Sequence, residues 1–324
     1  MRRQTKILLM IASLFVLLGV IIFVGVMTVL KWDFTKFQTI DYETNEYVIS
    51  EEYQNVSVVT NTCDVVVEYA ETENTVVVCK EQKNINHTVS VENGTLVIKV
   101  VDTRKWYEYI GIFPGTCRIT LSIPKAECGT LSVKTRTGDV KIAKEFVFES
   151  MDVLSNTGSV FCNASAKEQL KIKVKTGDVF LENVTAGKME AEASTGDIQL
   201  TNVNCQETAN VYVDTGKISL NGMTCRNLIA RGDTGDIGMT NVIVDNKMQV
   251  KADTGDVKFS DCDAGEMYIE TDTGNVKGSV LSDKIFFAKS GTGSVEVPKS
   301  MMGGACEIKT DTGDIHIVYS DKKQ

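Results

Sequence analysis

Apolar and polar residues alternate along most of the chain beyond residue 128. In segment 170–181, every second residue up to a Thr-Gly-Asp phrase is apolar or Thr, and the alternation resumes after the phrase. Alternation places successive side chains on opposite faces of a strand. The pattern therefore predicts two strands separated by a corner, with one face buried. The residues expected to point inward are Leu170, Ile172, Val174, Thr176, Val179 and Leu181.

The Thr-Gly phrase returns every 19 to 20 residues between Thr137 and Asp314. A fixed period of this length in strand-like sequence is typical of stacked coils, each of which buries its apolar face only against its neighbours. We therefore predict an all-β fold, a single-stranded parallel β-solenoid (β-helix) of about ten coils over residues 129–324. Its corner glycines would be Gly138, Gly158, Gly177, Gly196, Gly216, Gly235, Gly255, Gly274, Gly293 and Gly313.

The spacing also predicts how each corner is built. A Gly at a bend supplies a positive φ, and the Asp, Asn or Ser that usually follows it can bond the amides of the turn. The Thr before each Gly is expected to stack inside the rod. A second polar row marks another corner, namely Asn183, Asn202, Asn221, Asn241 and Asp261. Outward charges at one offset are expected to pair between neighbouring coils, Lys173 with Glu192 and Lys251 with Glu270.

The amino-terminal segment predicts one transmembrane helix. Residues 7–30 carry no charge and follow the basic residues 1–6. About 20 apolar residues span a bilayer, and residues 25–30 lack the small-residue cleavage site of a signal peptide. We expect a retained signal anchor, with the tail 1–6 cytoplasmic and everything after residue 30 extracytoplasmic at the cell membrane.

The segment between this helix and the repeats is expected to cap the solenoid. Residues 31–50 would be a juxtamembrane stalk or a first edge strand, and residues 51–128 would be capping strands and hairpins. Segment 56–67 repeats the coil register with Cys63 in the glycine position, and Asn93-Gly94 is a strong hairpin signal. These strands would close a sheet edge that could otherwise pair with other chains. The far end is expected to finish with Ile315, Ile317 and a charged tail.

Exposed apolar residues are the candidate partner-binding positions. Segment 102–116 breaks the pattern with aromatic residues, which we expect either to pack over the cap or to contact a partner or membrane. Two further pairs share an offset from their glycines and would form small outer patches, explained either by surface stacking or by partner binding. The candidates are Trp106, Tyr107, Tyr109, Ile112 and Phe113 in the loop, Phe161 with Phe180, and Tyr268 with Phe287.

The net charge and the cysteines of the chain argue against two kinds of function, nucleic-acid binding and metal binding. The formal charge of -9 and the lack of an extended basic stripe argue against a nucleic-acid partner. Nine cysteines, with no CxxC pair and no Cys/His spacing suited to zinc, predict no metal site. Cys205 and Cys225 should be stacked neighbours, either as two buried thiols or as a disulfide. Cys63 and Cys79 could face each other across a hairpin and bond in an oxidising compartment.

Acidic residues recur at the corners and allow two interpretations. Stacked carboxylates could hold Ca²⁺ or act on a glycan, but their repetition in nearly every coil favours turn structure, because an active site is needed once. His87 and His316 are expected to be solvent-exposed and far apart, and the sequence has no nucleophile motif or phosphate-cradling loop. We therefore expect no catalytic residue and no cofactor. The acidic rows are Asp139, Asp178, Asp197, Asp236, Asp256 and Asp314, and Asp214, Asp233, Asp253, Asp272 and Asp311.

The anchor, the hairpins, the strand Ile119–Lys125, the run GTLSVKTRTGDV from Gly129 to Val140 and the later coils together resemble the bacterial putative-adhesin domain family. The resemblance covers most of the chain after the anchor. It implies a bacterial envelope protein with a β-solenoid domain, and it transfers no catalytic residue.

These observations predict a membrane-anchored, extracytoplasmic and non-enzymatic solenoid that serves adhesion, scaffolding or envelope sensing. Its partners would be the membrane, through residues 7–30, and an envelope protein or glycan. The alternatives are a glycan-active β-helix enzyme, a cation-binding solenoid that uses the stacked Asp turns, and a rod of the same fold placed in the cytoplasm.

Overall fold

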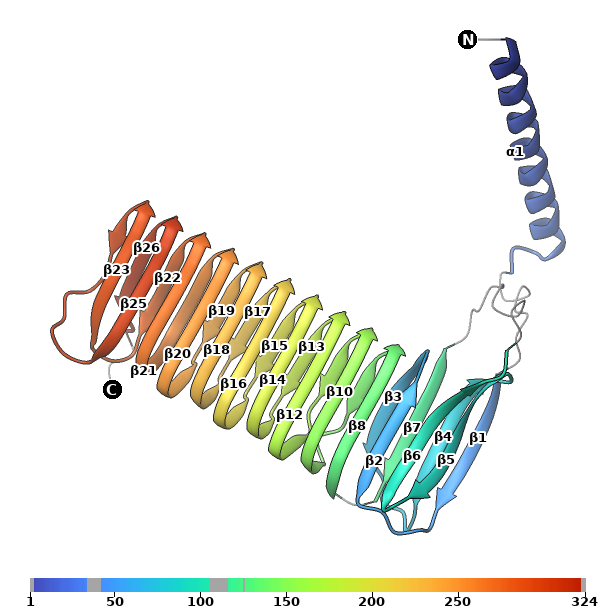
Figure 1. The fold of residues 1–324 in the computed structure, drawn as a ribbon, viewed down its shortest axis with the longest axis horizontal. Coiled ribbons are helices and arrows are strands. Elements are labelled where there is room, and N and C mark those ends of the chain that lie inside the picture. The colour runs from blue at the N-terminus through green and yellow to red at the C-terminus, as the bar shows by residue number, and fades with distance from the viewer. Residues whose placement is uncertain (1–2, 34–41, 105–115, 125, 322–324) are drawn as a thin grey trace.

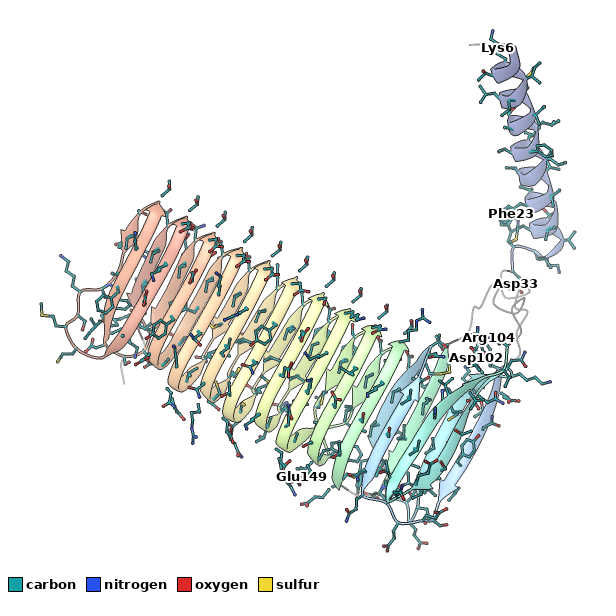
Figure 2. All side chains as sticks on the ribbon, viewed as in Figure 1. Lys6, Phe23, Asp33, Asp102, Arg104 and Glu149 are labelled. Atoms are coloured by element: carbon teal, nitrogen blue, oxygen red, sulfur yellow. A yellow bond between two sulfur atoms is a disulfide. The ribbon has the colours of Figure 1, made fainter. Side chains whose placement is uncertain are left out.

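A computed structural model describes residues 3–33, 42–104, 116–124 and 126–321. One helix, α1 (Arg3–Val29), precedes a long rod of strands and projects away from it in Figure 1. Figure 2 shows side chains radiating from every side of this helix, from Lys6 near its start to Phe23. The part Thr5–Val29 is long and apolar enough to cross a membrane, as the sequence predicts.

Each coil of the rod consists of a long strand, a glycine corner, a short strand and a second corner. Long strands pair in parallel with the long strands of neighbouring coils, and short strands pair with short strands, so that two sheets enclose one apolar interior. The predicted parallel β-solenoid is confirmed. The strand β21 (Val257–Thr273) is continuous across both sheets, because its first part pairs with β19 and its later part with β20.

The strands of the rod fall into two sets. The long set is β2 (Asn55–Thr60), β8 (Glu127–Thr137), β10 (Val147–Thr157), β12 (Ser165–Thr176), β14 (Thr185–Thr195), β16 (Asn204–Thr215), β18 (Thr224–Thr234), β20 (Ile243–Thr254), β23 (Lys284–Thr292) and β25 (Gly304–Thr312). The short set is β3 (Cys63–Tyr69), β9 (Val140–Ile142), β11 (Val160–Cys162), β13 (Val179–Glu182), β15 (Ile198–Thr201), β17 (Ile218–Asn221), β19 (Ile237–Thr240), β22 (Val276–Val280), β24 (Val295–Glu296) and β26 (Ile315–Tyr319).

The alternating sequence sets the register of this stack. Ile172 pairs with Ala191, and both are fully buried, whereas the neighbouring Lys173 pairs with Glu192 on the outer face. Lys173 also makes the predicted ion pair with Glu192. A slip of one residue would turn the aliphatic row outward and the charges inward, so burial fixes the alignment of every coil.

The glycine corners have the backbone geometry that the sequence predicts. The ten corner glycines have φ between 126° and 156°, a region that residues with a Cβ rarely adopt. At Gly196, a Cβ would also lie 2.1 Å from the carbonyl oxygen of Gly177 in the coil beneath. Glycine is therefore required both by the conformation and by the close approach of successive coils.

The second corner contains a row of residues in the left-handed conformation. Asn183 and Asn202 have φ of 56° and 53°, and the Asn202 amide donates to the Asn183 side-chain oxygen at 3.1 Å. This confirms an asparagine ladder at this corner. One predicted member is different, because Gly222 (φ 63°) takes the left-handed position in its coil and Asn221 ends the preceding strand. Asparagine and glycine are the residues that tolerate this conformation best.

The expected inward row of threonines is wrong. In β12, both Lys175 and Thr176 are exposed, so the alternation ends before the corner. Hydroxyls instead enter the interior three residues before the glycines, where Thr271 donates to the carbonyl of Gly255 at 3.0 Å and Thr310 donates to that of Gly274 at 2.9 Å. In these two coils the corner carbonyl supplies the partner that a buried hydroxyl needs, whereas the buried hydroxyls of Thr135 and Ser155 at the same position have no hydrogen-bond partner.

The proximal end is built from the seven strands that precede β8. β2 and β3 form the degenerate coil that the sequence predicts, because the Asp139 amide of the next coil donates to the Asp64 carboxylate at 3.1 Å. β6 (Thr95–Asp102) pairs with β2 and β7 (Cys117–Ile123) pairs with β3, both in parallel. Antiparallel strands then close this end, namely β4 (Thr75–Gln82), β5 (Ile85–Glu92) and β1 (Tyr42–Ile49). Residues 31–50 are predicted to be either a stalk or a first edge strand, and Tyr42–Ile49 form an edge strand.

The last two coils are stacked in the reverse of their order along the chain. β25 pairs with β21 on one side and with β23 on the other, and β26 lies likewise between β22 and β24. The distal coil is therefore formed by residues 284–296, and the expectation that Ile315 and Ile317 finish the rod is wrong. The chain moves outward through residues 281–283 and returns through residues 297–303, which form the loop at the far end of the rod in Figure 1.

Candidate interaction surfaces

The aromatic loop that the sequence singles out falls outside the described residues. Trp106, Tyr107, Tyr109, Ile112 and Phe113 all belong to residues 105–115. Immediately before these residues in the chain, the Arg104 guanidinium pairs with the Asp102 carboxylate at 2.7 Å (Figure 2). Partner binding by the loop stays a prediction.

Phe161 and Phe180 form the first predicted aromatic patch. They project from the neighbouring strands β11 and β13, with ring centroids 4.9 Å apart and ring planes inclined by 7°. The Lys141 ammonium lies 5.3 Å from the centroid of Phe161, within the range of a cation–π contact. Both rings are half-buried. The rings and the Lys141 side chain thus cover one another, so this patch has a structural explanation without a partner.

The second predicted patch does not exist as a pair. Tyr268 and Phe287 are both aligned with Glu307 of β25, one on each side, because of the reversed order of the last coils. Tyr268 is instead covered by the Lys247 ammonium, 4.3 Å from its ring centroid. Phe287 lies on the distal coil with 61% of its surface exposed. Of the two residues, only Phe287 remains an open apolar side chain.

Exposed apolar side chains are concentrated at the distal end of the rod. Among the described residues after the first helix and its flanking Trp32, the large apolar side chains with high exposure come only from the proximal cap and from residues 281–318. The coils from residue 131 to residue 280 contribute none. The distal set is Leu281, Phe287, Val295, Met301, Met302 and Val318, and the proximal set is Val48, Tyr69 and Val101.

The aspartates that follow the glycines hold neighbouring coils together. The Asp178 carboxylate accepts the amide of Asp197 at 2.8 Å, and the Asp197 carboxylate accepts the amide of Lys217 at 2.7 Å. At Asp256, the Asn275 amide and the nearby Lys258 ammonium hold the pKa of the carboxyl below its usual range. The carboxylates therefore act as acceptors for turn amides, which is the structural role favoured in the sequence.

A buried polar cluster in the cap is the feature that the sequence did not predict. The Glu81 carboxylate accepts the His87 backbone amide at 2.7 Å and lies 2.6 Å from His87 Nδ1. Both side chains are fully buried, so the expectation that His87 is exposed is wrong. The other His87 nitrogen lies 3.0 Å from the Thr60 hydroxyl, and Asn45 of β1 donates to the second Glu81 oxygen at 2.8 Å. The cluster joins β1, β2, β4 and β5.

The same cluster contains residue types found in metal and catalytic sites. Cys79, Glu81 and His87 each offer a ligand atom within 4.8 Å of the others, and a carboxylate, an imidazole and a hydroxyl in a row are typical of nucleophilic catalysis. However, Thr60 is only 3% exposed, so no substrate reaches its hydroxyl. The Glu81 oxygens are already occupied by hydrogen bonds. The arrangement is that of a satisfied structural core.

Of the two predicted cysteine pairs, the bond between Cys63 and Cys79 is wrong. Cys63 forms a disulfide with Cys117, which joins β3 to β7, and Cys79 is not disulfide-bonded. Cys205 and Cys225 are stacked neighbours and are both buried thiols, which agrees with the first alternative for that pair. Burial raises the pKa of the Cys225 thiol to about 12. The second histidine, His316, is exposed as predicted and lies 2.9 Å from Glu296.

A family model matches the chain over residues 53–213 and again over residues 206–324, which together span all the coils and the cap strands except β1. The chain belongs to the Toastrack DUF4097 family. No curated protein matches it.

Three solved structures are similar to this Toastrack chain at low sequence identity. A putative adhesin from Bacteroides fragilis is 15% identical, with a TM-score of 0.40 over 86% of this chain and 97% of that chain. A putative adhesin from Parabacteroides distasonis is 11% identical, with a TM-score of 0.42 over 86% and 97% of the two chains. A third, from Parabacteroides merdae, is 11% identical, with a TM-score of 0.39 over 87% and 98%.

A local signal in the Toastrack chain could have identified the buried histidine. Ile85, His87 and Val89 occupy alternate positions of one strand, and the first two are buried. Because alternation places these three side chains on one face, a histidine between two β-branched apolar residues is expected inside. No comparable pattern indicates that Glu81 would be its partner.

Proposed function

We propose that this chain is a membrane-anchored, extracytoplasmic and non-enzymatic solenoid that presents an interaction surface at the cell envelope, for adhesion, scaffolding or sensing. The single observation that carries the proposal is the helix α1. Apart from the buried Met27 near its end, the apolar side chains described in this helix face outward, without a protein surface to pack against. A bilayer is the environment in which such a helix is stable.

The Cys63–Cys117 disulfide supports the extracytoplasmic location. Structural disulfides persist in oxidising compartments and are rare in the reducing cytosol. A tryptic digest of the protein from its native membrane, run without reductant, should contain the two peptides joined. Recovery of both peptides as free thiols would favour the cytoplasmic alternative.

Interaction, rather than catalysis, is favoured by the distribution of side chains in the described coils. Asp178 and Asp197 are held in turns, and His87 is closed off from solvent. The exposed His316 is paired with Glu296 on the outer surface, with no cavity lined by the two residues among those described. The exposed apolar groups gather at the end of the rod farthest from the cap. This arrangement suits a rod that carries a binding tip away from its anchor.

Labelling of introduced cysteines in intact cells tests the topology, with the wild type, whose nine native cysteines include the half-buried Cys128, as the background. Lys188→Cys replaces a side chain that is 62% exposed on the rod, and Thr5→Cys places a thiol at the start of the apolar helix. We expect a membrane-impermeant maleimide to label Lys188→Cys in intact cells and Thr5→Cys only after permeabilisation. The mass of the purified protein should include residues 1–30. A reversed labelling pattern would overturn the orientation, and loss of residues 1–30 would overturn the anchor.

A further inference from the structure

The distal coil presents two open sheet edges together with the apolar side chains concentrated there. Among the described strands, β23 pairs only with β25, and β24 pairs only with β26, so one side of each strand has no strand neighbour. Unpaired N–H and C=O groups on an edge are a template for another strand. Phe286, Val297 and Met301 line a hollow beside this edge. A polypeptide with its own free strand edge and an apolar face is the kind of partner that fits.

The coil geometry suits a second copy of the same chain. β23 and β24 belong to opposite sheets, and a two-fold axis perpendicular to both sheets would place each strand antiparallel to its own copy. Because β24 has only two residues and lies beside the corner, such an axis pairs β23 with its own copy, and the apolar end faces would cover each other. An interface of this kind is isologous and closes at two copies.

Charge complementarity supports the same occupant and sets the register. Lys289 is the exposed charge on β23, and a lysine on an edge strand normally opposes pairing. If Phe286 lies on the two-fold axis, Lys289 falls opposite Asp283 of the second copy and Phe287 falls opposite Ile285. The lysine then meets a carboxylate, and the exposed ring meets an aliphatic side chain.

The proximal end offers no equivalent surface. Its edge strand β1 carries the carboxylates Glu43 and Glu46 and no basic residue, so no register of two copies of that edge gives an ion pair between them. The remaining charge on β23, Lys284, is buried and already paired with Asp263 at 2.5 Å. The distal edge is therefore the end of the rod that is matched to itself.

We propose that the distal coil, residues 281–303, binds the same coil of a second copy through antiparallel pairing of β23 with its own copy, with Lys289 opposite Asp283. The two-fold axis directs the two rods away from each other. Two copies anchored in facing membranes would therefore meet tip to tip, which makes the contact homophilic. This inference deepens the proposed function and relies on it only for the statement that the anchors lie in different membranes.

Clustering of proteoliposomes that carry the full-length chain tests the proposal. Vesicle size is followed by light scattering as protein density is raised, and the variants are Lys289→Asp, Asp283→Lys, the double exchange and Phe287→Ser. Tyr268→Ser is the matched control, because Tyr268 occupies the same outward column two coils away from the tip. Circular dichroism and melting of each variant show whether it remains folded.

We expect the wild type and Tyr268→Ser to cluster at equal density. Lys289→Asp and Phe287→Ser should each raise the density needed by about tenfold or more, equivalent to about 1.4 kcal/mol, and the double charge exchange should restore clustering. Wild-type vesicles that stay separate would overturn the proposal. Clustering that is insensitive to both tip variants, or that the double exchange does not restore, would overturn it as well. Because this assay does not depend on cellular topology, it can fail while the labelling experiment succeeds, and the reverse.

Discussion

The amide of Gly274 donates to the carbonyl oxygen of Thr312 at 2.9 Å, although Thr312 belongs to the last coil of the chain and another coil lies between them in sequence. This bond places the carboxyl-terminal coil inside the stack. Its strands β25 and β26 therefore have neighbours on both sides. The coil at the open end is an internal segment, residues 281–303, whose two ends both emerge from the stack. In a solenoid stacked in chain order, the carboxyl-terminal strands would lie at an open edge. Here they are paired on both sides.

The alternation of buried and outer positions predicts which distal substitutions destabilise the rod. Ile308 of β25 is fully buried, whereas Ile285 of β23 is only half-buried. We expect Ile308→Ala to lower the free energy of unfolding by about 2–5 kcal/mol and Ile285→Ala by about 1 kcal/mol or less. Urea denaturation followed by circular dichroism measures both. Equal costs for the two variants would contradict the assignment of Ile308 to the interior face and Ile285 to the outer face.

A pair of glycine substitutions tests the corner geometry. Gly196 has φ of 138° and its added Cβ would lie 2.1 Å from the Gly177 carbonyl oxygen, whereas a Cβ at Gly238 would meet its nearest neighbour at 3.9 Å. We expect Gly196→Ala to cost about 3 kcal/mol or more, and Gly196→Val to cost more still. Gly238→Ala should change stability by about 1 kcal/mol or less. Melting temperatures compare the variants, and equal values for the two alanine variants would contradict the corner assignment.

The two histidine–glutamate pairs allow a matched comparison of burial. Glu81 and His87 are fully buried, whereas Glu296 and His316 are 77% and 48% exposed at a similar separation. Replacing Glu81 by Gln leaves a buried imidazole without its carboxylate, and we expect a loss of about 3–5 kcal/mol in the free energy of unfolding. Glu296→Gln should cost about 1 kcal/mol or less, because solvent screens the exposed pair.

Denaturation of the two glutamine variants under the same conditions measures the difference. The buried variant should also loosen β1, because Asn45 donates to Glu81. Hydrogen exchange at Tyr42–Ile49 would report this loosening directly. Equal stability of the two variants would mean that the cap does not depend on its buried carboxylate.

Period and alternation were sufficient to predict the fold, because both are local properties that every coil repeats. The positive φ of Gly196 and the ion pair of Lys173 with Glu192 follow from spacing alone. The inward row of threonines failed because a strict period of two was extended into the corner. There the backbone turns, and Thr176 follows Lys175 to the exposed side.

The order of the last coils and the disulfide partner of Cys63 could not be predicted in the same way. Each coil has nearly the same apolar pattern, so β25 fits against β21 or beyond β23 equally well on pattern alone. Tyr268 and Phe287 were therefore expected to be adjacent. Cys63 lies 54 residues from Cys117, and only the pairing of β3 with β7 brings them together. Contacts between non-repeating segments carry no periodic signal.

Because of its buried thiols, the rod is expected to lose stability as the pH rises through the alkaline range. Burial raises the pKa of Cys225 from the ordinary value of 9.0 to about 12, and it does the same for Cys162. In the unfolded chain these thiols would ionise above pH 9.0, whereas in the folded chain they stay protonated until about pH 12. The stabilisation is therefore complete below pH 9.0 and is lost as pH rises toward 12.

A single cysteine variant isolates this effect from the other groups that titrate in the same range. Between pH 8 and pH 10, one thiol with such a shift should contribute about 1 kcal/mol to the loss of stability. We expect the free energy of unfolding of Cys225→Ala to fall by about that much less than that of the wild type over this interval. Urea denaturation at the two pH values measures both proteins, in a background where Cys63 and Cys117 are Ala and with reductant present, so that ionised thiols have no disulfide to exchange with. Equal losses in the two proteins would mean that Cys225 ionises as readily in the folded rod as in the unfolded chain.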